Sequence, residues 1–319
     1  LGVFFTCLFS VLAVRLFNLQ IIEGETYQEN YMAKTEKVVS LPSTRGNIYD
    51  RNGNVLAYNE LAYNVTIQDN GQFSTTNERN LMLLELVQIL NRHGEKIQGD
   101  LAIGFDYTGE LVFTTTSELE RKRFLRDYYG LRSIDELDNE EGTTPSDVTA
   151  REILESRKKA YGLDKLTDKD GNPIALTDEE ALAIANIRYT MNFTAYRKYE
   201  STTVAANVSK ETMTDVLENS ADLKGVNIEK TTNRVYNDSV YFAPIIGYIG
   251  KIWDEELEVL KKSDSDYELT DLVGKTGVES SMESYLKGKK GSQTMYVDSM
   301  GRILEIVSEE APEAGNDIY

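Results

Sequence analysis

Two short patterns in this chain could support acyl transfer by a serine nucleophile. Ser156 precedes Lys159 by three residues, and this spacing on a helix puts a hydroxyl and an amine on one face, where the amine can accept the hydroxyl proton. Lys275-Thr276-Gly277 matches the K-[ST]-G pattern that such enzymes carry on another element. The third pattern of the set, S-x-N, occurs nowhere in the 319 residues.

Neither pattern lies in a setting that suits a nucleophile. The segment from Arg151 to Lys159 is dense in charge, whereas a nucleophilic serine needs a partly buried site with oxyanion donors. A helix is expected directly after Lys275-Thr276-Gly277, whereas the catalytic version of this pattern lies on a strand. Because S-x-N is also missing, we predict no catalytic residue in this chain.

The chain also lacks the residues that most metal and cofactor sites need. It has one histidine, His93, and one cysteine, Cys7, which excludes a multi-histidine metal centre, a histidine triad and an internal disulfide. The segment 168–172 resembles part of a calcium loop, but an EF-hand would need acidic residues where Leu166 and Thr177 stand. We interpret it as a β-turn and predict no metal and no cofactor.

The elements that must position these residues change in character along the chain. Alternation of Tyr63, Val65 and Ile67 with polar residues is typical of strands and ends a β-rich segment, 35–69. Helical patterns follow at 78–91, with Leu83, Leu86, Val87 and Leu90 on one face, and then at 117–129, 146–161 and 178–192. Thr177 and Glu180 predict a capping box at the start of the last of these helices, and a β-like segment at 97–116 that turns at Gly109 separates the first two. Strands return at 204–208 and 225–232, and a helix at 210–220 lies between them. These patterns predict an α+β fold, a β-rich discontinuous domain with an inserted, mainly helical lobe.

The N-terminal segment 1–22 is mostly apolar, and Arg15 is its only charge. A run of this kind predicts a transmembrane signal anchor, truncated at its start, whose Arg15 reaches the membrane interface. The alternative is a soluble amphipathic helix that packs through Leu8, Leu12, Leu16 and Leu19.

Four motifs in the chain follow the order of one protein family. They are residues 45–57, which begin Arg45-Gly46-Asn47-Ile48-Tyr49-Asp50-Arg51-Asn52-Gly53; Arg234-Val235-Tyr236 with 243–248; Gly274-Lys275-Thr276-Gly277-Val278-Glu279, continuing through Glu283 and Leu286 to Gly288 and Gly291; and Asp298-Ser299-Met300-Gly301-Arg302. Within the first, Asn52-Gly53 predicts a tight type I′ hairpin, in which both residues have positive φ. Together the motifs resemble the non-catalytic pedestal, or dimerisation domain, of class B penicillin-binding proteins, the transpeptidases of bacterial wall synthesis. The second motif departs from the family pattern, with Asn237 for the usual Pro and Pro244 near the usual His.

The resemblance selects a candidate site of charged residues and glycines within the motifs. The charged residues are Arg45, Asp50, Arg51, Arg234, Glu279 and Arg302, and the motif glycines are Gly46, Gly53, Gly247, Gly274, Gly277 and Gly301. We expect the charged residues to form a buried polar network that joins distant segments, because the guanidinium fork can hold two oxygens at once. The alternative is a set of independent turn caps and surface pairs.

The resemblance also implies a role for each segment of the chain. We expect a membrane anchor at 1–22, pedestal segments at 23–69 and 202–319, and the inserted lobe at 70–201, with a serine-type D,D-transpeptidase domain following Tyr319. The pedestal would position that domain for peptidoglycan cross-linking on the extracytoplasmic face of the cell membrane. Expected partners are membrane proteins of the division or elongation machinery and a second copy of the chain. The alternative is a stand-alone membrane-anchored adaptor or sensor. The formal net charge of −19 argues against nucleic acid as a partner.

Overall fold

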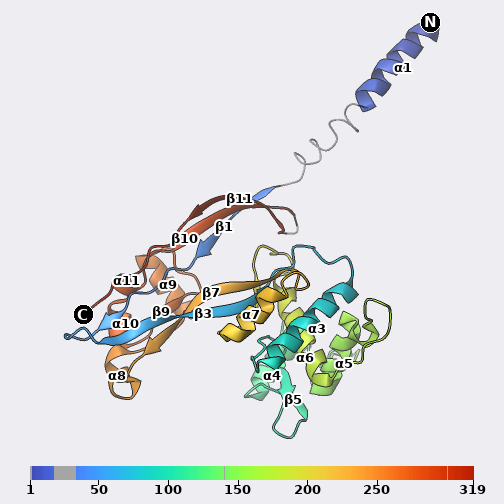
Figure 1. Ribbon diagram of the computed structural model, residues 1–319. Helices are drawn as coiled ribbons and strands as arrows, with labels where there is room; N and C mark the ends of the chain where they lie inside the picture. The colour runs from blue at the N-terminus through green and yellow to red at the C-terminus, as the bar shows by residue number, and fades with distance from the viewer. Residues whose placement is uncertain (1, 18–33, 140, 300) are drawn as a thin grey trace.

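The computed structural model describes residues 2–17, 34–139, 141–299 and 301–319. Its central element is β3 (Val55–Ile67), which pairs antiparallel with β7 (Val226–Tyr236) through eleven residue pairs. On its other edge, β2 (Ile48–Tyr49) and β6 (Thr202–Ala205) pair with opposite ends of β3. Figure 1 shows the β3–β7 ribbon running across the molecule between two groups of helices. Segments 35–69 and 225–236 therefore meet directly, although more than 150 residues separate them.

The first group of helices lies at one end of the ribbon (Figure 1). It contains α3 (Thr76–Arg92), the hairpin of β4 (Ile103–Phe105) and β5 (Leu111–Phe113), α4 (Glu118–Tyr129), η2 (Ile134–Glu136), α5 (Ala150–Tyr161), η3 (Leu163–Lys165), α6 (Asp178–Phe193) and α7 (Lys210–Glu218). The expected capping box of Thr177 and Glu180 begins α6. A second capping box, Thr149 with Glu152, makes α5 begin four residues later than the pattern predicted.

One apolar core fills this helical group and continues into the sheet. The predicted face of α3 is fully buried, with Leu83, Leu86 and Val87 at 0% exposure. Ile67 of β3 and Val204 of β6 belong to the same core. The helices therefore pack against β3, which precedes them in the chain, and β6, which follows α6. The expected boundaries of the lobe at 70 and 201 stay a prediction.

The second group lies at the other end of the ribbon. It contains α8 (Ser239–Ile246), β8 (Ile249–Lys251), α9 (Asp254–Ser263), β9 (Leu272–Gly274), α10 (Gly277–Ser281) and α11 (Glu283–Leu286). A separate sheet in the order β1-β10-β11 is formed by β1 (Thr35–Leu41), β10 (Gly291–Val297) and β11 (Ile303–Glu310). Two small cores serve the second group, one around Ile246 and Leu286 and one around Ile252 and Val273. The prediction of a mixed fold of sheets and helices is confirmed.

The turn between β2 and β3 differs from the predicted hairpin. Gly53 has a φ of 84°, but Asn52 is not among the residues with positive φ, so the turn is not type I′. The Gly53 amide donates to the Asp50 carbonyl at 2.9 Å, and the Asp50 carboxylate accepts from the Asn52 and Asn54 amides, both at 2.8 Å. The prediction was wrong because the Asp50 side chain organises a longer loop with only its last corner left-handed.

The N-terminal helix α1 (Gly2–Phe17) has 16 residues. Among the residues that the structure describes, no helix combines the length and the apolar character that crossing a bilayer requires. Residues 1 and 18–22 of the expected anchor lie outside the described residues, so the anchor stays a prediction.

Candidate functional site: a buried arginine and glutamate cluster

Three of the four motifs meet at one buried carboxylate. Glu279, in the first turn of α10, is 0% exposed. Its Oε2 lies 2.6 Å from Nε of Arg45, which precedes β2, and its Oε1 lies 2.9 Å from Nε of Arg234 in β7. The two guanidinium side chains are 9% and 2% exposed. A single carboxylate therefore joins segments that are 234 and 45 residues away from it in the chain.

Other donors of the two arginines bind nearby backbone and side chains, whereas Arg234 Nη2 is buried without a hydrogen-bond partner. Arg45 Nη2 lies 2.7 Å from Glu283 Oε2 and donates to the Glu279 carbonyl at 2.9 Å. Arg234 Nη1 donates to the Gly46 carbonyl at 2.7 Å and to Asn59 Oδ1 at 3.3 Å. Two cations and two carboxylates make the cluster neutral, which is how buried charge is tolerated.

The electrostatics of the cluster fix its charge state. Burial disfavours the charge of Arg45, but the hydrogen bond and charge of Glu283 and those of Glu279 outweigh it and raise the pKa of Arg45 above its usual value. Burial, reinforced by the charge of Glu279, raises the pKa of the adjacent Tyr236 phenol to about 12. Arg45 thus stays cationic and Tyr236 stays neutral at physiological pH, which suits a structural cluster rather than proton transfer.

Motif glycines allow the backbone to close around the cluster. Gly247 has a φ of 79° and Gly277 a φ of 60°, and a side chain on either would collide with the backbone around the other, at Thr276 and Ile245 respectively. Gly46 and Gly274 also have no room for a side chain, because the backbones of Asn316 and Glu279 pass beside them. Glycine is therefore required here by close backbone approach.

The other predicted charged residues lie elsewhere. Asp50 stabilises its own turn, and hydrogen bonds from Asn54 and Asn52 lower its pKa. Arg51 is exposed in that turn. Arg302 forms an ion pair of 2.6 Å with Asp298 in the turn between β10 and β11. Gly301 of this turn packs on the backbone of residues 196–198, and Met300 lies outside the described residues. The expected six-residue network is thus a three-residue cluster plus separate turns, because hairpin tips project away from the core.

Two residues of the cluster were missed by sequence reasoning. Glu283 accepts from Arg45 and from the Gly274 amide at 2.9 Å, and Asn59 bridges Arg234 and the Arg45 carbonyl. The spacing of Glu279 and Glu283, four residues apart in a short helical segment, could have indicated that both carboxylates face the same arginine. Asn59 lies in a long strand and gives no comparable signal.

The structure keeps the apparent catalytic patterns apart. Ser156 and Lys159 are exposed on α5, whereas Lys275 follows β9 at the opposite end of the molecule (Figure 1). Lys275 pairs with Glu256 and lies 4.6 Å from the centre of the Trp253 ring. The two patterns therefore cannot act together within this chain.

The calcium-like segment is a turn, as predicted. Asp168 accepts from the amides of Asp170 at 2.9 Å and Asn172 at 2.8 Å, which satisfies its carboxylate locally. Across the residues that the structure describes, no group of three or more His, Cys, Asp or Glu side chains could hold a metal ion.

The last residues of the chain lie against the corner that carries Arg45. The Gly315 amide donates to the Thr44 carbonyl at 2.8 Å, and the Ile318 amide donates to the Asn47 carbonyl at 3.0 Å. Tyr319 stacks on Tyr49 with ring centres 4.9 Å apart. Segment 315–319 is therefore fixed in position by the same corner that the cluster stabilises.

Sequence comparisons agree with this arrangement of motifs. The family model of the penicillin-binding protein dimerisation domain matches residues 40–319. Among curated proteins, penicillin-binding protein 2A of Bacillus subtilis is 24% identical over 98% of this chain, and peptidoglycan D,D-transpeptidase MrdA of Haemophilus influenzae is 22% identical over 97%. The MrdA protein of Acinetobacter baumannii is 35% identical over 41% of the chain. The chain spans 40%, 34% and 19% of these relatives, respectively.

A solved structure shares the fold. Penicillin-binding protein 2B of Streptococcus pneumoniae (strain 5204) superposes with a TM-score of 0.50 and 17% sequence identity, covering 89% of this chain and 40% of that one. The family match covers most of the chain and includes the three motifs that meet at Glu279. The chain therefore belongs to the penicillin-binding protein dimerisation domain family and is a pedestal region of the class B type.

Proposed function

We propose that this chain is the pedestal that holds a D,D-transpeptidase domain in position for peptidoglycan cross-linking. The observation that carries the proposal is the cluster at Glu279, which locks three distant motifs and the corner beside segment 315–319 into one unit. A rigid exit from the pedestal would restrict the direction in which an attached domain can point. The names of the curated relatives support peptidoglycan as the substrate of that domain.

The division of the pedestal belongs to the same proposal. Segments 23–69 and 202–319 would form the discontinuous β-rich part, and 70–201 would form the inserted helical lobe. The long β3–β7 pairing supports this, since it joins the two segments on either side of the helices. The apolar N-terminal segment 1–22 would be the single membrane anchor, with the bulk of the chain on the extracytoplasmic face.

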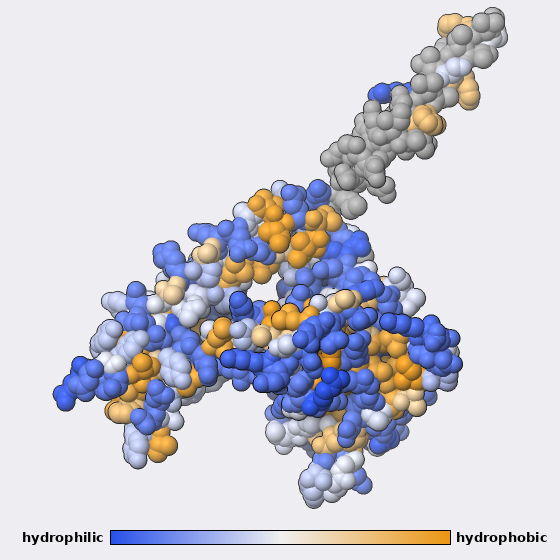
Figure 2. Space-filling model, in the orientation of Figure 1, coloured by the Kyte–Doolittle hydropathy of each residue, from blue (hydrophilic) through white to orange (hydrophobic). Residues whose placement is uncertain are grey.

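The partners that we propose are proteins of the cell-wall synthesis machinery, at division or elongation sites. Figure 2 shows apolar surface over the sheet of β1, β10 and β11. Val38, Leu304, Ile306 and Val307 are 63%, 39%, 53% and 50% exposed there. Exposed apolar groups concentrated on one sheet are typical of a protein contact surface. A second copy of the chain is the alternative occupant.

Labelling with a fluorescent penicillin tests the proposal. The purified 319-residue chain should form no acyl-enzyme, whereas the full-length gene product that contains this segment should be labelled. Absence of label from the full-length product would favour the stand-alone adaptor instead. A labelled band from the 319-residue chain that disappears in Ser156→Ala would overturn the assignment of catalysis to another domain.

A further inference from the structure

A second site lies in the helical group, away from the Glu279 cluster. It is a pocket of about 170 Å³ between the end of β3, α3, the end of α6 and the loop that leads to β6. Three basic side chains line it, Arg79, Arg188 and Lys198, together with the two acids Asp69 and Glu200. The lining therefore has one more basic than acidic group, although the chain as a whole has a net charge of −19.

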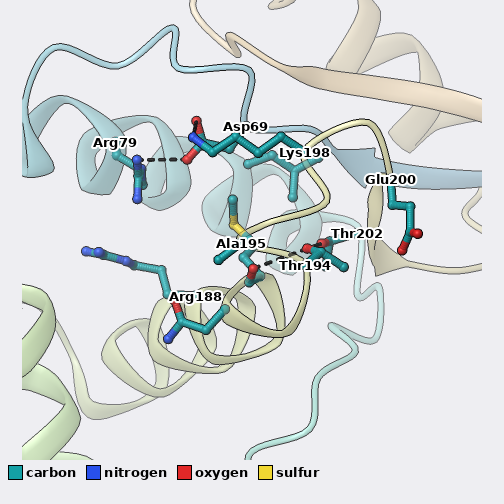
Figure 3. A pocket seen from close by; sticks show the side chains of 11 residues that line it. Asp69, Arg79, Arg188, Thr194, Ala195, Lys198, Glu200 and Thr202 are labelled. Atoms are coloured by element: carbon teal, nitrogen blue, oxygen red, sulfur yellow. Dashed lines mark hydrogen bonds and ion pairs between the residues drawn. The ribbon is translucent and has the colours of Figure 1, made fainter. Parts of the chain in front are cut away.

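The two acids are already engaged. Asp69 Oδ2 lies 2.8 Å from Arg79 Nη2, and Asp69 Oδ1 lies 3.8 Å from Lys198 Nζ. Glu200 pairs at 3.0 Å with Arg197, which does not line the pocket. Figure 3 shows Glu200 on the side of the pocket opposite Arg79 and Arg188. Of the three cations, Arg188 is therefore left without a carboxylate.

Arg188 is held in place by neutral groups. Its Nη1 donates to Asn80 Oδ1 at 2.8 Å and to the Tyr161 carbonyl at 2.9 Å, and its guanidinium lies 4.5 Å from the centre of the Tyr161 ring. It forms no ion pair with any residue that the structure describes. Burial, and then the positive charge of Arg79, lower the pKa of Arg188 to about 10. The site therefore presents a fixed cation whose charge is not neutralised.

One of the lining arginines also has a donor without an acceptor. Nε of Arg79 is buried and makes no hydrogen bond. Figure 3 shows Arg79 and Arg188 on the same side of the pocket, with the hydrogen-bonded pair of Thr194 and Thr202 on the other. The charge of Arg79 opposes that of Arg188, and an oxyanion that accepted from both guanidinium groups would offset this repulsion.

We propose that this pocket binds a compact oxyanion, the carboxylate or phosphate group of a small ligand, between Arg79 and Arg188. The hydroxyl groups of Thr194 and Thr202 would contact the uncharged part of the ligand. The turn between β10 and β11 packs through Gly301 on the backbone of Lys198, so an occupied pocket would contact a loop that also supports the fourth motif. The proposal does not depend on the transpeptidase role.

Calorimetric titration of the full 319-residue chain tests the site, with inorganic phosphate in one series and acetate in another at constant ionic strength. Binding of either anion supports the site, and the anion that binds with the higher affinity identifies the preferred group as phosphate or carboxylate. Arg188→Gln should weaken binding by about tenfold or more, because it removes one of two charge-assisted contacts. Asp69→Asn should strengthen binding severalfold, because it frees Arg79 and Lys198.

Arg151→Gln is the matched control, since it removes an exposed arginine that pairs with Asp178, and neither residue lines the pocket. It should leave anion affinity unchanged. If Arg188→Gln does not fold, Arg188→Lys keeps the charge but loses the fork and should bind phosphate more weakly than the unmodified chain. No binding of either anion at tens of millimolar, or equal losses in Arg188→Gln and Arg151→Gln, or weaker binding in Asp69→Asn, would overturn the proposal.

Discussion

Replacing Arg234 by Ala should destabilise the fold strongly. The change removes an ion pair to Glu279, whose side chain is fully buried, and hydrogen bonds to the Gly46 carbonyl and to Asn59. Removing one partner of a buried pair costs about 3–5 kcal/mol. Glu279 keeps its contact with Arg45, so its charge is not fully stranded, and the expected loss is about 2–4 kcal/mol.

The prediction can be measured by thermal and denaturant unfolding of the purified chain. For a domain of this size the loss corresponds to a fall in Tm of roughly 4–15 °C. Arg45→Ala should cause a loss of similar size, because Arg45 binds both Glu279 and Glu283. Arg51→Ala is the matched control, since this arginine is exposed in a turn and should change stability by less than about 0.5 kcal/mol.

A double-mutant cycle separates the ion pair from general loss of packing. In a Glu279→Ala background, Arg234→Ala should cost clearly less than it does alone, because the charged partner is already gone. Unchanged melting of both Arg234→Ala and Arg45→Ala would refute the reasoning. Strictly additive losses in the cycle would show that the carboxylate is not what holds Arg234.

Three further predictions concern acid, a glycine and a serine. Hydrogen bonds lower the pKa of Asp50 and Asp168 in the folded chain. The stabilising effect of these hydrogen bonds is therefore present above the unfolded pKa of about 3.9 and should be lost as pH falls through the folded pKa. Melting temperatures measured between pH 6 and pH 3 would detect the loss. Gly247→Ala should lower the melting temperature far more than Gly109→Ala, because both glycines have positive φ but only Gly247 faces backbone in close contact; equal losses would contradict this. Ser156→Ala in the full-length gene product should leave penicillin labelling intact, and loss of labelling on a gel without loss of folding would contradict it.

Local sequence patterns determined the type and order of most elements. Thr177 with Glu180 marked the start of α6, and the spacing of Leu83, Leu86 and Val87 identified the buried face of α3. A capping box and an apolar helix face depend on residues within a few positions of each other, so the local sequence pattern is sufficient to predict them. The turn at Asp50 was misjudged because its side chain competed with the tight hairpin.

Which charged residues meet was decided only by the tertiary structure. Arg45, Arg234 and Arg302 each belong to one of the motifs, yet only the first two lie on segments that the β3–β7 ribbon and α10 bring to one buried carboxylate. The pocket of Arg79 and Arg188 likewise joins helices about a hundred residues apart and has no motif of its own. Sequence determined the local elements and the family, because both depend on neighbouring residues. Long-range pairing determined the site, because burial and charge compensation exist only after distant segments pack together.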